Sequence, residues 1–372
     1  MKILIYYPEP LFPINSGGRN RIYNLANNLS ANNTILLIAY NSLLKQNAIR
    51  KTINNNFQYL EAKRQSILDK LTFKVRRLLC KKFVFVPSHW QYFKQFNPDI
   101  IISEHCFSFF QCYFYAKKHE IPIILDQQNF ESELFPQYPY YRFKFWEKLS
   151  LKKSNYITCC SEIDKNKFIN LLPAIKHKIS VIENGINLNV IKPDLSSRNK
   201  IRNKLGFKNN DFVFCFHGSA NYRPNKEALN YIYKNLKDFK IILFGRDMPN
   251  KKIGNVISLG CIEPLNDYLN ACDAGIAPLI SGSGTRIKIL EYFACAKPVI
   301  STMKGAEGIK YQNNFNIIIS NLDNFPQKMK ILAQNKSLQQ SIGNNARILA
   351  KNNYIWKTIA NKLGKVIQHH FK

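Results

Sequence analysis

The chain has 372 residues, 45% of them hydrophobic, and its formal net charge at pH 7 is +30. This length suits two domains of ordinary size, and the apolar fraction is high enough to bury a core in each, which excludes a disordered chain. No apolar run is long enough to span a bilayer, and the first residues lack the apolar region of a signal peptide, so we expect a cytoplasmic protein.

The excess of positive charge predicts a polyanionic partner, either nucleic acid or the acidic face of a membrane. Basic residues are concentrated in the segment 63–82, where they flank an apolar arc that includes Leu68, Leu71 and Leu78. This pattern is typical of a helix on an anionic bilayer, and equally of a surface helix whose apolar stripe faces the core. A second segment, 135–153, alternates aromatic and basic residues and favours the membrane, while no recognised nucleic-acid-binding module is visible.

The first predicted elements are a strand, a loop, a helix and a second strand. The strands are 2–7 and 34–39, the loop contains Gly17 and Gly18, and apolar side chains recur at helical spacing from Ile22 to Leu29. Such a unit pairs its strands in parallel and leaves its loop at the carboxyl edge of the sheet, where ligands bind in open α/β folds.

Polar residues follow the ends of the next predicted strands. Glu104 and His105 follow the strand at 98–102, Asp126 to Glu131 follow the strand at 121–125, and Ser161 follows the strand at 156–160. A turn at 184–187 and a hydrophilic stretch from Asp194 to Lys204 place a domain boundary near Lys192 and Pro193.

The second half repeats the pattern of strands that end in glycine-containing turns. A strand at 212–216 leads into His217, Gly218 and Ser219, and further strands are predicted at 241–244, 256–259 and 274–279. Near the end of the chain, apolar residues from Trp356 to Ile367 keep helical spacing. These units of strand, turn and helix predict a second α/β domain.

A glycine-rich loop, Ser281 to Gly284, follows the strand at 274–279 and leads into a helix that we expect to begin near Thr285. Gly282 and Gly284 let a ligand approach the backbone, and the free N–H groups of a helix N-terminus attract phosphate. The loop matches neither the P-loop pattern nor the dinucleotide-binding fingerprint.

Three charged residues lie along this helix. Arg286 and Lys288 add two positive charges, and the carboxylate of Glu291 could accept hydrogen bonds from the hydroxyls of a ribose. A nucleoside diphosphate would therefore fit the stretch, although Lys and Glu three residues apart are also typical of a solvated helix face.

The stretch 282–291 reads G-S-G-T-R-I-K-I-L-E and is followed by P-V-I-S-T and G-A-E-G. It resembles the donor-binding signature of the family 4 glycosyltransferases, in the branch that reads G-x-G-T-R-x-K-x-L-E. The resemblance implies an α/β chain of the GT-B fold, in which two Rossmann-like domains face a central cleft, and a retaining reaction. The family usually has two glutamates here, and this chain has Ser283 and Glu291 at those positions. Where relatives read D-x-H-N-x-E, it has Gln128 in place of the histidine.

The resemblance implies a set of site residues, with no metal ion and no cofactor. Because glutamine cannot exchange a proton, Gln128 is expected only to position the donor sugar. The catalytic set is Gln128, Glu131, Arg286 and Lys288. The donor-binding set is Gly17, Gly18, Gly218, Ser219, Gly282, Ser283, Gly284, Thr285 and Glu291.

The expected domains are an acceptor-side domain at 1–190, a nucleotide-sugar-binding domain at 191–352 and a C-terminal helix at 353–372 that crosses back to the first domain. We predict a glycosyltransferase on the inner face of the cytoplasmic membrane. It would transfer a hexose-type sugar from a nucleotide diphosphate sugar to a glycan or lipid-linked acceptor in cell-envelope polysaccharide or lipopolysaccharide synthesis.

Two other functions fit parts of the sequence. Ser283 and Gln128 would also suit a catalytically inactive relative that binds a nucleotide or a glycan. The net charge of +30 alone would suit a nucleic-acid binder.

Overall fold

The computed structural model describes residues 1–63, 84–134, 140–282 and 284–371. The chain forms two compact units. The first unit comprises Met1–Glu183 together with Trp356–Lys372, and the second comprises Asn184–Ile355.

Several sequence-based predictions fall outside the described residues. The basic segment 64–83, predicted as a membrane-surface helix, is one of them, and Ser283 and the start of the aromatic segment, 135–139, are others. Among the residues that are described, no helix is long and apolar enough to cross a membrane.

The first unit is built on a mostly parallel sheet. Its strands are β1 (Lys2–Tyr7), β2 (Thr34–Tyr40), β3 (Ala48–Asn54), β4 (Phe57–Ala62), β5 (Ile100–Glu104), β6 (Ile123–Gln127), β7 (Tyr156–Cys159) and β8 (Ile179–Val181). They lie in the order β3-β4-β2-β1-β5-β6-β7-β8. All neighbouring strands are parallel except the edge pair β3 and β4.

The helices of the first unit are α1 (Gly17–Leu29), α3 (Trp90–Phe96), α4 (His105–Lys118), α5 (Glu131–Leu134), α6 (Tyr140–Lys153), α7 (Glu162–Leu171) and α14 (Trp356–Phe371). The described part of this unit also contains two 3-10 helices, Pro87–His89 and Pro173–Lys178.

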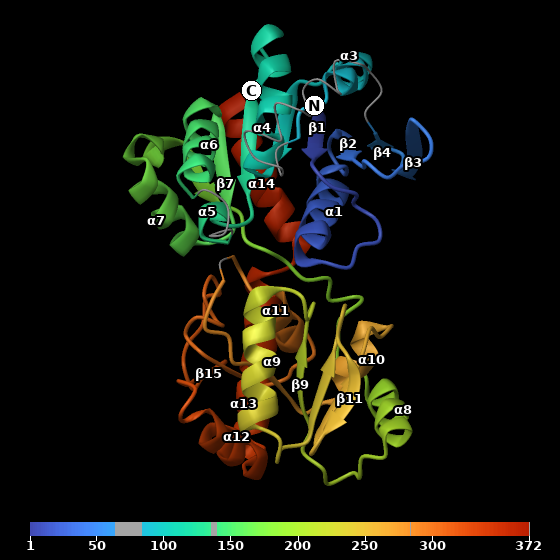
Figure 1. Cartoon of the computed structure of the whole chain (residues 1–372), viewed down its shortest axis with the longest axis vertical. Coiled ribbons are helices and arrows are strands. Elements are labelled where there is room, and N and C mark those ends of the chain that lie inside the picture. Colours follow the sequence, from blue (N-terminus) through green and yellow to red (C-terminus); the bar gives the residue numbers. More distant parts are fainter. Residues whose placement is uncertain (64–83, 135–139, 283, 372) are drawn as a thin grey trace. The chain divides into compact units, whose positions relative to one another are not determined.

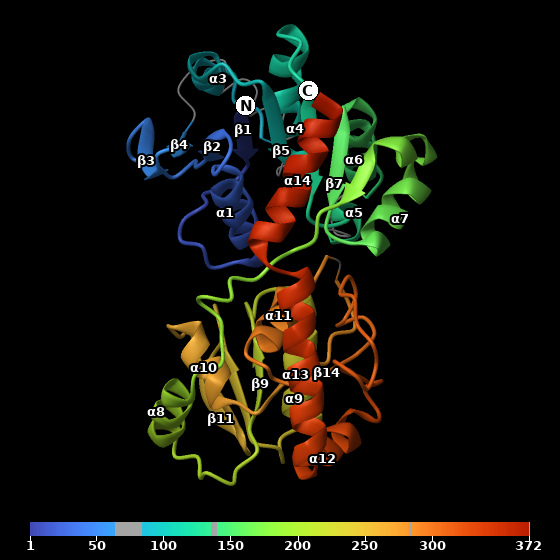
Figure 2. The ribbon, with the colours of Figure 1, turned by 180° about the vertical axis from the view of Figure 1, so that it is seen from behind.

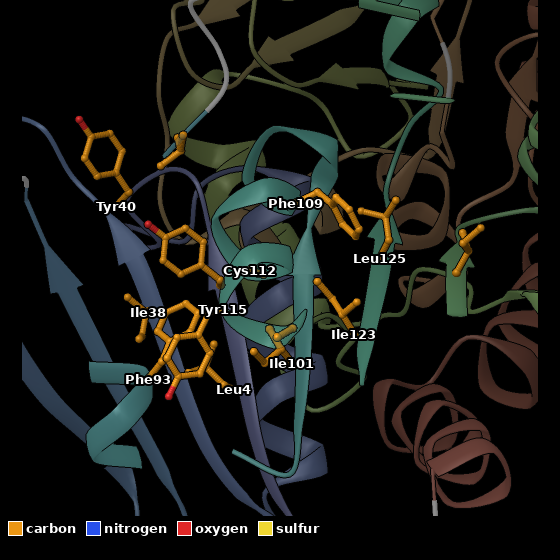
Figure 3. Packing of buried hydrophobic residues seen from close by; sticks show 14 of the residues in the cluster. Leu4, Ile38, Tyr40, Phe93, Ile101, Phe109, Cys112, Tyr115, Ile123 and Leu125 are labelled. Atoms are coloured by element: carbon orange, nitrogen blue, oxygen red, sulfur yellow. The ribbon is translucent and has the colours of Figure 1, made fainter. Parts of the chain in front are cut away.

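Both faces of this sheet are apolar because helices cover both of them. In β1, Ile3 and Ile5 pack on the face covered by α1 and α14, whereas Leu4 and Tyr6 pack on the face covered by α3 and α4. Figures 1 and 2 view the two faces, with α4 in front in the first and α14 in front in the second. Figure 3 shows the cluster around Leu4, where Tyr115 of α4 lies beside the strands.

The last helix belongs to the first unit, although the whole second unit precedes it in the chain. Trp356, Ile359, Leu363 and Ile367 are buried in the same cluster as the apolar face of α1. The spacing of three or four residues gives one apolar stripe, which is why this segment is a helix that packs on its neighbour.

A buried ion pair ties α1 to β6. The guanidinium of Arg21 donates from Nε and Nη2 to the two carboxylate oxygens of Asp126, each at 2.9 Å, and the Arg21 side chain is only 1% exposed. Its Nη1 donates to the carbonyl oxygens of Ile182 and Glu183, and Thr158 Oγ1 donates to Asp126. Burial raises the pKa of Asp126, but the charge and hydrogen bonds of Arg21 outweigh this and hold the pKa below its usual value.

The second unit repeats the architecture. Its strands are β9 (Phe214–His217), β10 (Ile241–Phe244), β11 (Asn250–Ile253), β12 (Val256–Leu259), β13 (Ala274–Ala277), β14 (Val299–Ser301) and β15 (Ile318–Ile319). Its helices are α8 (Leu195–Leu205), α9 (Arg223–Asn235), α10 (Leu265–Ala271), α11 (Ile287–Ala294), α12 (Phe325–Gln334) and α13 (Lys336–Asn353).

The strands of the second sheet lie in the order β11-β12-β10-β9-β13-β14-β15, and only the pair β11 and β12 is antiparallel. Successive residues of β9 alternate between two cores: Cys215 packs with α11 and α13, and Phe216 packs with α9 and α12. Figures 1 and 2 again show the two faces, with α9 in front in the first and α13 in front in the second. The predicted pair of Rossmann-like α/β domains is therefore confirmed.

Some predicted boundaries differ from the observed ones. The helix expected from Thr285 begins at Ile287, because the backbone of Arg286 is extended (φ −82°, ψ 92°) and its side chain bonds back to the preceding loop. The chain enters the second unit at Asn184, and Ile186 and Ile191 already pack in that unit's core, whereas the sequence placed the boundary after residue 190.

Each sheet has one point where the strand order reverses. In the first sheet the chain builds outward from β1 in one direction and resumes with β5 on its other side, and in the second sheet β9 and β13 hold the same positions. Between such strands the loops at the carboxyl ends separate and leave a crevice, where open α/β sheets bind ligands. A ligand site is therefore expected among the residues that follow β1, β5, β9 and β13.

We predict that Asp126→Ala destabilises the first unit by about 3–5 kcal/mol, because it leaves the charge of Arg21 buried without its partner. Urea unfolding followed by tryptophan fluorescence measures this unit alone, since Trp90, Trp146 and Trp356 all lie in it.

Lys362→Ala is the matched control, because Lys362 pairs with Glu183 in the same unit but its side chain is 47% exposed. In this variant the free energy of unfolding of the first unit should fall by no more than about 1 kcal/mol. Equal losses in the two variants would contradict the role given to the buried pair.

Candidate functional site

The loops after β9 and β13 meet at the reversal point of the second sheet. Gly282 has a φ of 98°, and a Cβ built on it would lie 2.8 Å from both Pro224 Cγ of α9 and Nη2 of Arg286. Only glycine fits this position, because a side chain would need both a left-handed backbone and space that is already filled. The glycine-rich loop is thereby held close to the first turn of α9.

Arg286 fixes the shape of this loop. Its guanidinium donates from Nη1 to the carbonyl oxygen of Gly284 at 3.0 Å and from Nη2 to that of Ser281 at 3.1 Å. The residue is 7% exposed. Its positive charge therefore lies against the carbonyl oxygens of Ser281 and Gly284, where it contributes to the local potential.

Lys288 lies beside the turn that follows β9. Its Nζ donates to Oδ1 of Asn225 at 2.8 Å and lies 3.8 Å from the ring centroid of Phe216. Asn225 in turn donates to the carbonyl oxygen of Ser219, and a Cβ at Gly218 would come within 3.3 Å of Nζ. Because Gly218 has no side chain, its backbone lies close to the ammonium group of Lys288 with no side-chain atom between them.

Burial strongly affects the charge of this lysine. Burial lowers the pKa of Lys288 well below its usual value, the charge of Arg286 lowers it further, and Glu291 opposes both. An anion bound beside Lys288 would raise its pKa again, because a nearby negative charge favours the protonated ammonium group. The environment of Lys288 therefore suits a negatively charged ligand such as a phosphate.

Glu291 lies one turn further along α11 and is buried, with 9% exposure, rather than on a solvated face. Burial raises its pKa to about 7, and the charge of Lys288 opposes this rise. Near neutral pH the carboxyl group is thus divided between its two protonation states, so it can accept or donate a hydrogen bond.

The carboxyl group of Glu291 is 3.2 Å from Nε2 of His217, but the two groups are not aligned as in a hydrogen bond. The ring of His217 stacks on Phe244 with a centroid distance of 5.5 Å and an interplanar angle of 2°. Burial and the charge of Lys288 lower the pKa of His217 to about 3, so this imidazole is neutral at physiological pH and the contact is not an ion pair.

In the first unit, the start of α1 contacts the residues after β6. A Cβ at Gly18 would lie 2.7 Å from Oε1 of Gln128, and Nε2 of Gln128 donates to Oε2 of Glu104 at 3.0 Å. Burial and the charge of Asp126 raise the pKa of Glu104 to about 8. Gln128 is therefore held between the carboxyl group of Glu104 and the backbone of the glycine loop.

Glu131 forms a second set of contacts at the same edge. Its Oε1 lies 2.8 Å from Nδ1 of His105 and accepts a hydrogen bond of 3.3 Å from the side chain of Asn129. The backbone N–H of Glu131 donates to Oε1 of Glu147. The carboxyl group of Glu131 is only 3% exposed and is fixed by its neighbours on several sides.

The structure separates the predicted site residues by unit. Gly17, Gly18, Gln128 and Glu131 lie in the first unit, and the remaining described ones lie in the second. Two hydroxyl groups of the donor-binding set are already engaged, since Ser219 donates to Asp247 and Thr285 donates to the carbonyl oxygen of Gly308.

Sequence reasoning missed four residues at these sites. His217 and Asn225 contact the donor-binding set in the second unit, and Glu104 and His105 contact Gln128 and Glu131 in the first. His217 directly precedes Gly218, and the pair Glu104 and His105 directly follows a predicted strand. Polar residues at strand ends were the available signal, but their partners are distant in the sequence.

The two halves of the chain match family models. Residues 15–190 match the model described as Glycosyltransferase Family 4, and residues 211–335 match the model described as Glycosyl transferases group 1. Among curated proteins, the chain is 27% identical over 260 residues to an uncharacterized glycosyltransferase of Methanocaldococcus jannaschii, covering 64% of each protein.

A second relative is the UDP-Gal:alpha-D-GlcNAc-diphosphoundecaprenol alpha-1,3-galactosyltransferase of Escherichia coli. It is 26% identical over 218 residues, which cover 53% of this chain and 56% of the relative. The chain thus spans less than two thirds of the length of these curated relatives, 64% of the first and 56% of the second.

Solved structures resemble the chain over its whole length. Sucrose-phosphate synthase from Thermosynechococcus elongatus has a TM-score of 0.80 at 13% identity, covering 100% of this chain and 99% of that one. Anabaena HepE in complex with UDP-glucose has a TM-score of 0.77 at 16% identity, and the match covers 99% of this chain and 100% of the HepE chain. At these identities the likeness establishes the fold, and it confirms the predicted GT-B fold class.

We predict that the second unit loses stability as the pH falls from 6.5 towards 3, because the folded state depresses the pKa of His217 and unfolding therefore takes up a proton. Between roughly pH 6.5 and 4.5, the free energy of unfolding of the second unit should fall less in the variant His217→Gln than in wild type, by on the order of 2 kcal/mol. Thermal melting followed by circular dichroism detects both units, and tryptophan fluorescence identifies the transition of the first.

The raised pKa of Glu291 acts in the opposite direction, since its stabilisation is complete below pH 4.5 and lost as the pH rises through about 7. Glu291 is present in both wild type and His217→Gln, so the difference between their pH profiles reports on His217. This is the only histidine between residues 184 and 355. A parallel pH dependence in wild type and variant would rule out the buried neutral imidazole.

Proposed function

Because the chain belongs to the glycosyltransferases of the GT-B fold, we propose that it transfers a hexose-type sugar from a nucleoside diphosphate sugar to a glycan or lipid-linked acceptor. The observation that carries the proposal is the arrangement of Gly218, Lys288 and Glu291 at the reversal point of the second sheet. Cell-envelope polysaccharide or lipopolysaccharide synthesis is the proposed setting.

The second unit is the proposed donor site. The diphosphate would lie near the glycine loops and Lys288, where a desolvated cation gains most from an anion. Glu291 would accept hydrogen bonds from the ribose hydroxyls. A uridine nucleotide is the first candidate, because the Escherichia coli relative is named for UDP-galactose and the HepE structure contains UDP-glucose.

In this proposal the enzyme acts mainly by stabilising the leaving group. As the bond between the sugar and the diphosphate breaks, negative charge develops on the diphosphate, and Lys288, Arg286 and the loop N–H groups would stabilise it. The proposal includes no metal ion and no cofactor. Retention of the anomeric configuration is proposed from the resemblance to the family 4 enzymes.

The first unit is the proposed acceptor side. Gln128, proposed to position the donor sugar, and Glu131 are held at the reversal point of its sheet by their bonds to Glu104 and His105. The lipid-linked acceptor named for the Escherichia coli relative, an N-acetylglucosamine diphosphate lipid, is the first acceptor to test.

We further propose that the protein is cytoplasmic and binds the anionic inner face of the cytoplasmic membrane through α4 and α6. Phe114 on α4 is 48% exposed and Phe145 on α6 is 59% exposed. Each helix ends in a pair of lysines: α4 at Lys117 and Lys118, and α6 at Lys152 and Lys153. Exposed aromatic rings beside lysines suit the headgroup layer of an anionic bilayer, and this partner accounts for the net charge without nucleic acid.

We predict that one family of nucleotides raises the melting temperature of the protein. A ligand at roughly one hundred times its dissociation constant adds about 2.7 kcal/mol, which corresponds to several degrees. UDP, GDP, ADP, CMP and their sugar conjugates should be compared by thermal shift, and the response should be specific for one base.

Lys288→Ala and Glu291→Ala should each weaken donor binding or turnover by about 1–3 kcal/mol per lost charged hydrogen bond. Lys330→Ala, on the exposed surface of α12 in the same unit, is the control and should respond as wild type does. If no nucleotide stabilises the wild-type protein, the alternative of an inactive, glycan-binding relative replaces the proposal.

For the membrane, we predict that the protein sediments with vesicles of phosphatidylglycerol and phosphatidylcholine but not with phosphatidylcholine alone, and that added salt releases it. The double variant Phe114→Ser, Phe145→Ser should bind several-fold more weakly. Phe315→Ser, which alters a 50% exposed phenylalanine of the second unit, should not. Equal binding of all three proteins would exclude α4 and α6 as the contact.

A further inference from the structure

His105 occupies the reversal point of the first sheet. It directly follows β5, and it begins α4 with a φ of 61°, a left-handed conformation that residues with side chains seldom adopt. Its ring lies 6.3 Å, centroid to centroid, from that of Tyr7 at the end of β1, and 5.9 Å from that of Phe107. The imidazole is thus placed between the carboxyl ends of the two strands where a ligand crevice forms.

One side of the ring is fixed by a carboxylate. Nδ1 of His105 lies 2.8 Å from Oε1 of Glu131, which also accepts a hydrogen bond from Asn129. The other side is available, since Nε2 makes no hydrogen bond with any residue that the structure describes, and the side chain is 13% exposed. A histidine whose Nδ1–H is fixed by a carboxylate presents its Nε2 in a defined direction, and this nitrogen carries a proton to donate when the ring is protonated.

The surrounding charges favour the protonated ring. Burial lowers the pKa of His105, but the hydrogen bond and charge of Glu131 outweigh it, and Glu104 and Glu9 add to the rise, so the pKa lies above its usual value. These carboxylates come from α5, from the end of β5 and from the loop after β1.

Other charged groups lie one step further from the ring. Arg21 and Asp126 act on Glu104, Glu147 acts on Glu131 from α6 and Arg19 bonds the hydroxyl of Tyr7. Glu131, which contacts the ring directly, remains the dominant charged neighbour of His105.

We propose that His105 is a substrate-binding residue of the first unit, whose Nε2–H donates a hydrogen bond to a phosphate or hydroxyl oxygen of the diphosphate-linked acceptor while Glu131 holds the ring. The proton stays on the imidazole throughout. This inference rests on the proposed function and deepens it, because it assigns a cationic group to the acceptor side.

The properties of Gln128 explain why a cationic residue such as His105 is needed at this edge of the sheet. Its amide is already bonded to Glu104 and packs against Gly18, and glutamine carries no charge at any pH. Besides Arg19, which bonds the hydroxyl of Tyr7, an acceptor with a diphosphate would meet the carboxyl groups of Glu9, Glu104 and Glu131 at this edge. The imidazolium of His105 supplies the attraction that those groups lack.

The direct test is nuclear magnetic resonance of protein labelled in the imidazole nitrogens. His105→Gln identifies the His105 signals among those of the seven histidines. A soluble N-acetylglucosamine diphosphate alkyl ester should shift the Nε2 signal and raise the pKa of His105, while UDP-glucose alone should leave both unchanged. A shift with UDP-glucose only, or with neither compound, overturns the assignment to the acceptor.

The kinetic test compares wild type, His105→Gln and His119→Gln as the pH is varied. With the diphosphate ester as acceptor, kcat/KM should fall about ten- to one-hundred-fold in His105→Gln. Wild-type kcat/KM should also decline as the pH rises through the pKa of His105, and this decline should be missing in the variant. His119 lies exposed at the other end of α4, so its variant should behave as wild type does.

Failure of the proposed function has a different signature. If wild type neither binds a nucleotide nor transfers sugar, the glycosyltransferase proposal fails, yet the resonance titration with the diphosphate ester still decides the role of His105. If transfer proceeds and the pH profiles of wild type and His105→Gln coincide, the proposed function stands and the inference about His105 is wrong. Reduced stability of the variant is detected by its tryptophan transition in urea.

Discussion

The ion pair of Arg21 and Asp126 fixes the geometry on which the first site depends. Arg21 lies in the second turn of α1, and Asp126 lies at the end of β6, two residues before Gln128. Because both charges are buried and the contact is bidentate, a small displacement of α1 would cost both hydrogen bonds at once. The glycine loop and Gln128 are therefore held in contact by a charge pair that itself lies below the surface.

The second unit holds its charged groups differently. Lys288 is bonded to a neutral amide and packed on an aromatic ring, and Glu291 faces a neutral imidazole. Neither contact gives Lys288 a full counter-charge, and an anion bound beside it would supply one. Burial depresses the pKa of Lys288 and raises that of Glu291, so a bound diphosphate would favour uptake of protons at this site. In the proposed function, donor binding and protonation of this site are therefore coupled.

The sequence predicted the backbone of both sites better than their side-chain contacts. β1 and β10 were predicted with their observed limits, because short apolar runs bounded by polar or glycine residues leave little choice. Contacts such as that of Lys288 with Asn225 or of Gly18 with Gln128 join residues far apart in the chain. Their formation depends on strand order, which local patterns do not encode. The burial of Glu291 was missed for the same reason, since α13 and the neighbouring strands cover α11.

The placement of α14 also affects how the chain acquires its structure during synthesis. The second unit, Asn184–Ile355, is complete in sequence before any residue of α14 has left the ribosome, whereas the first unit waits for its last helix. Until then, the surface of α1 that α14 contacts, including Leu29, stays open to solvent or to chaperones. The unit that is translated first is therefore the one that finishes folding last.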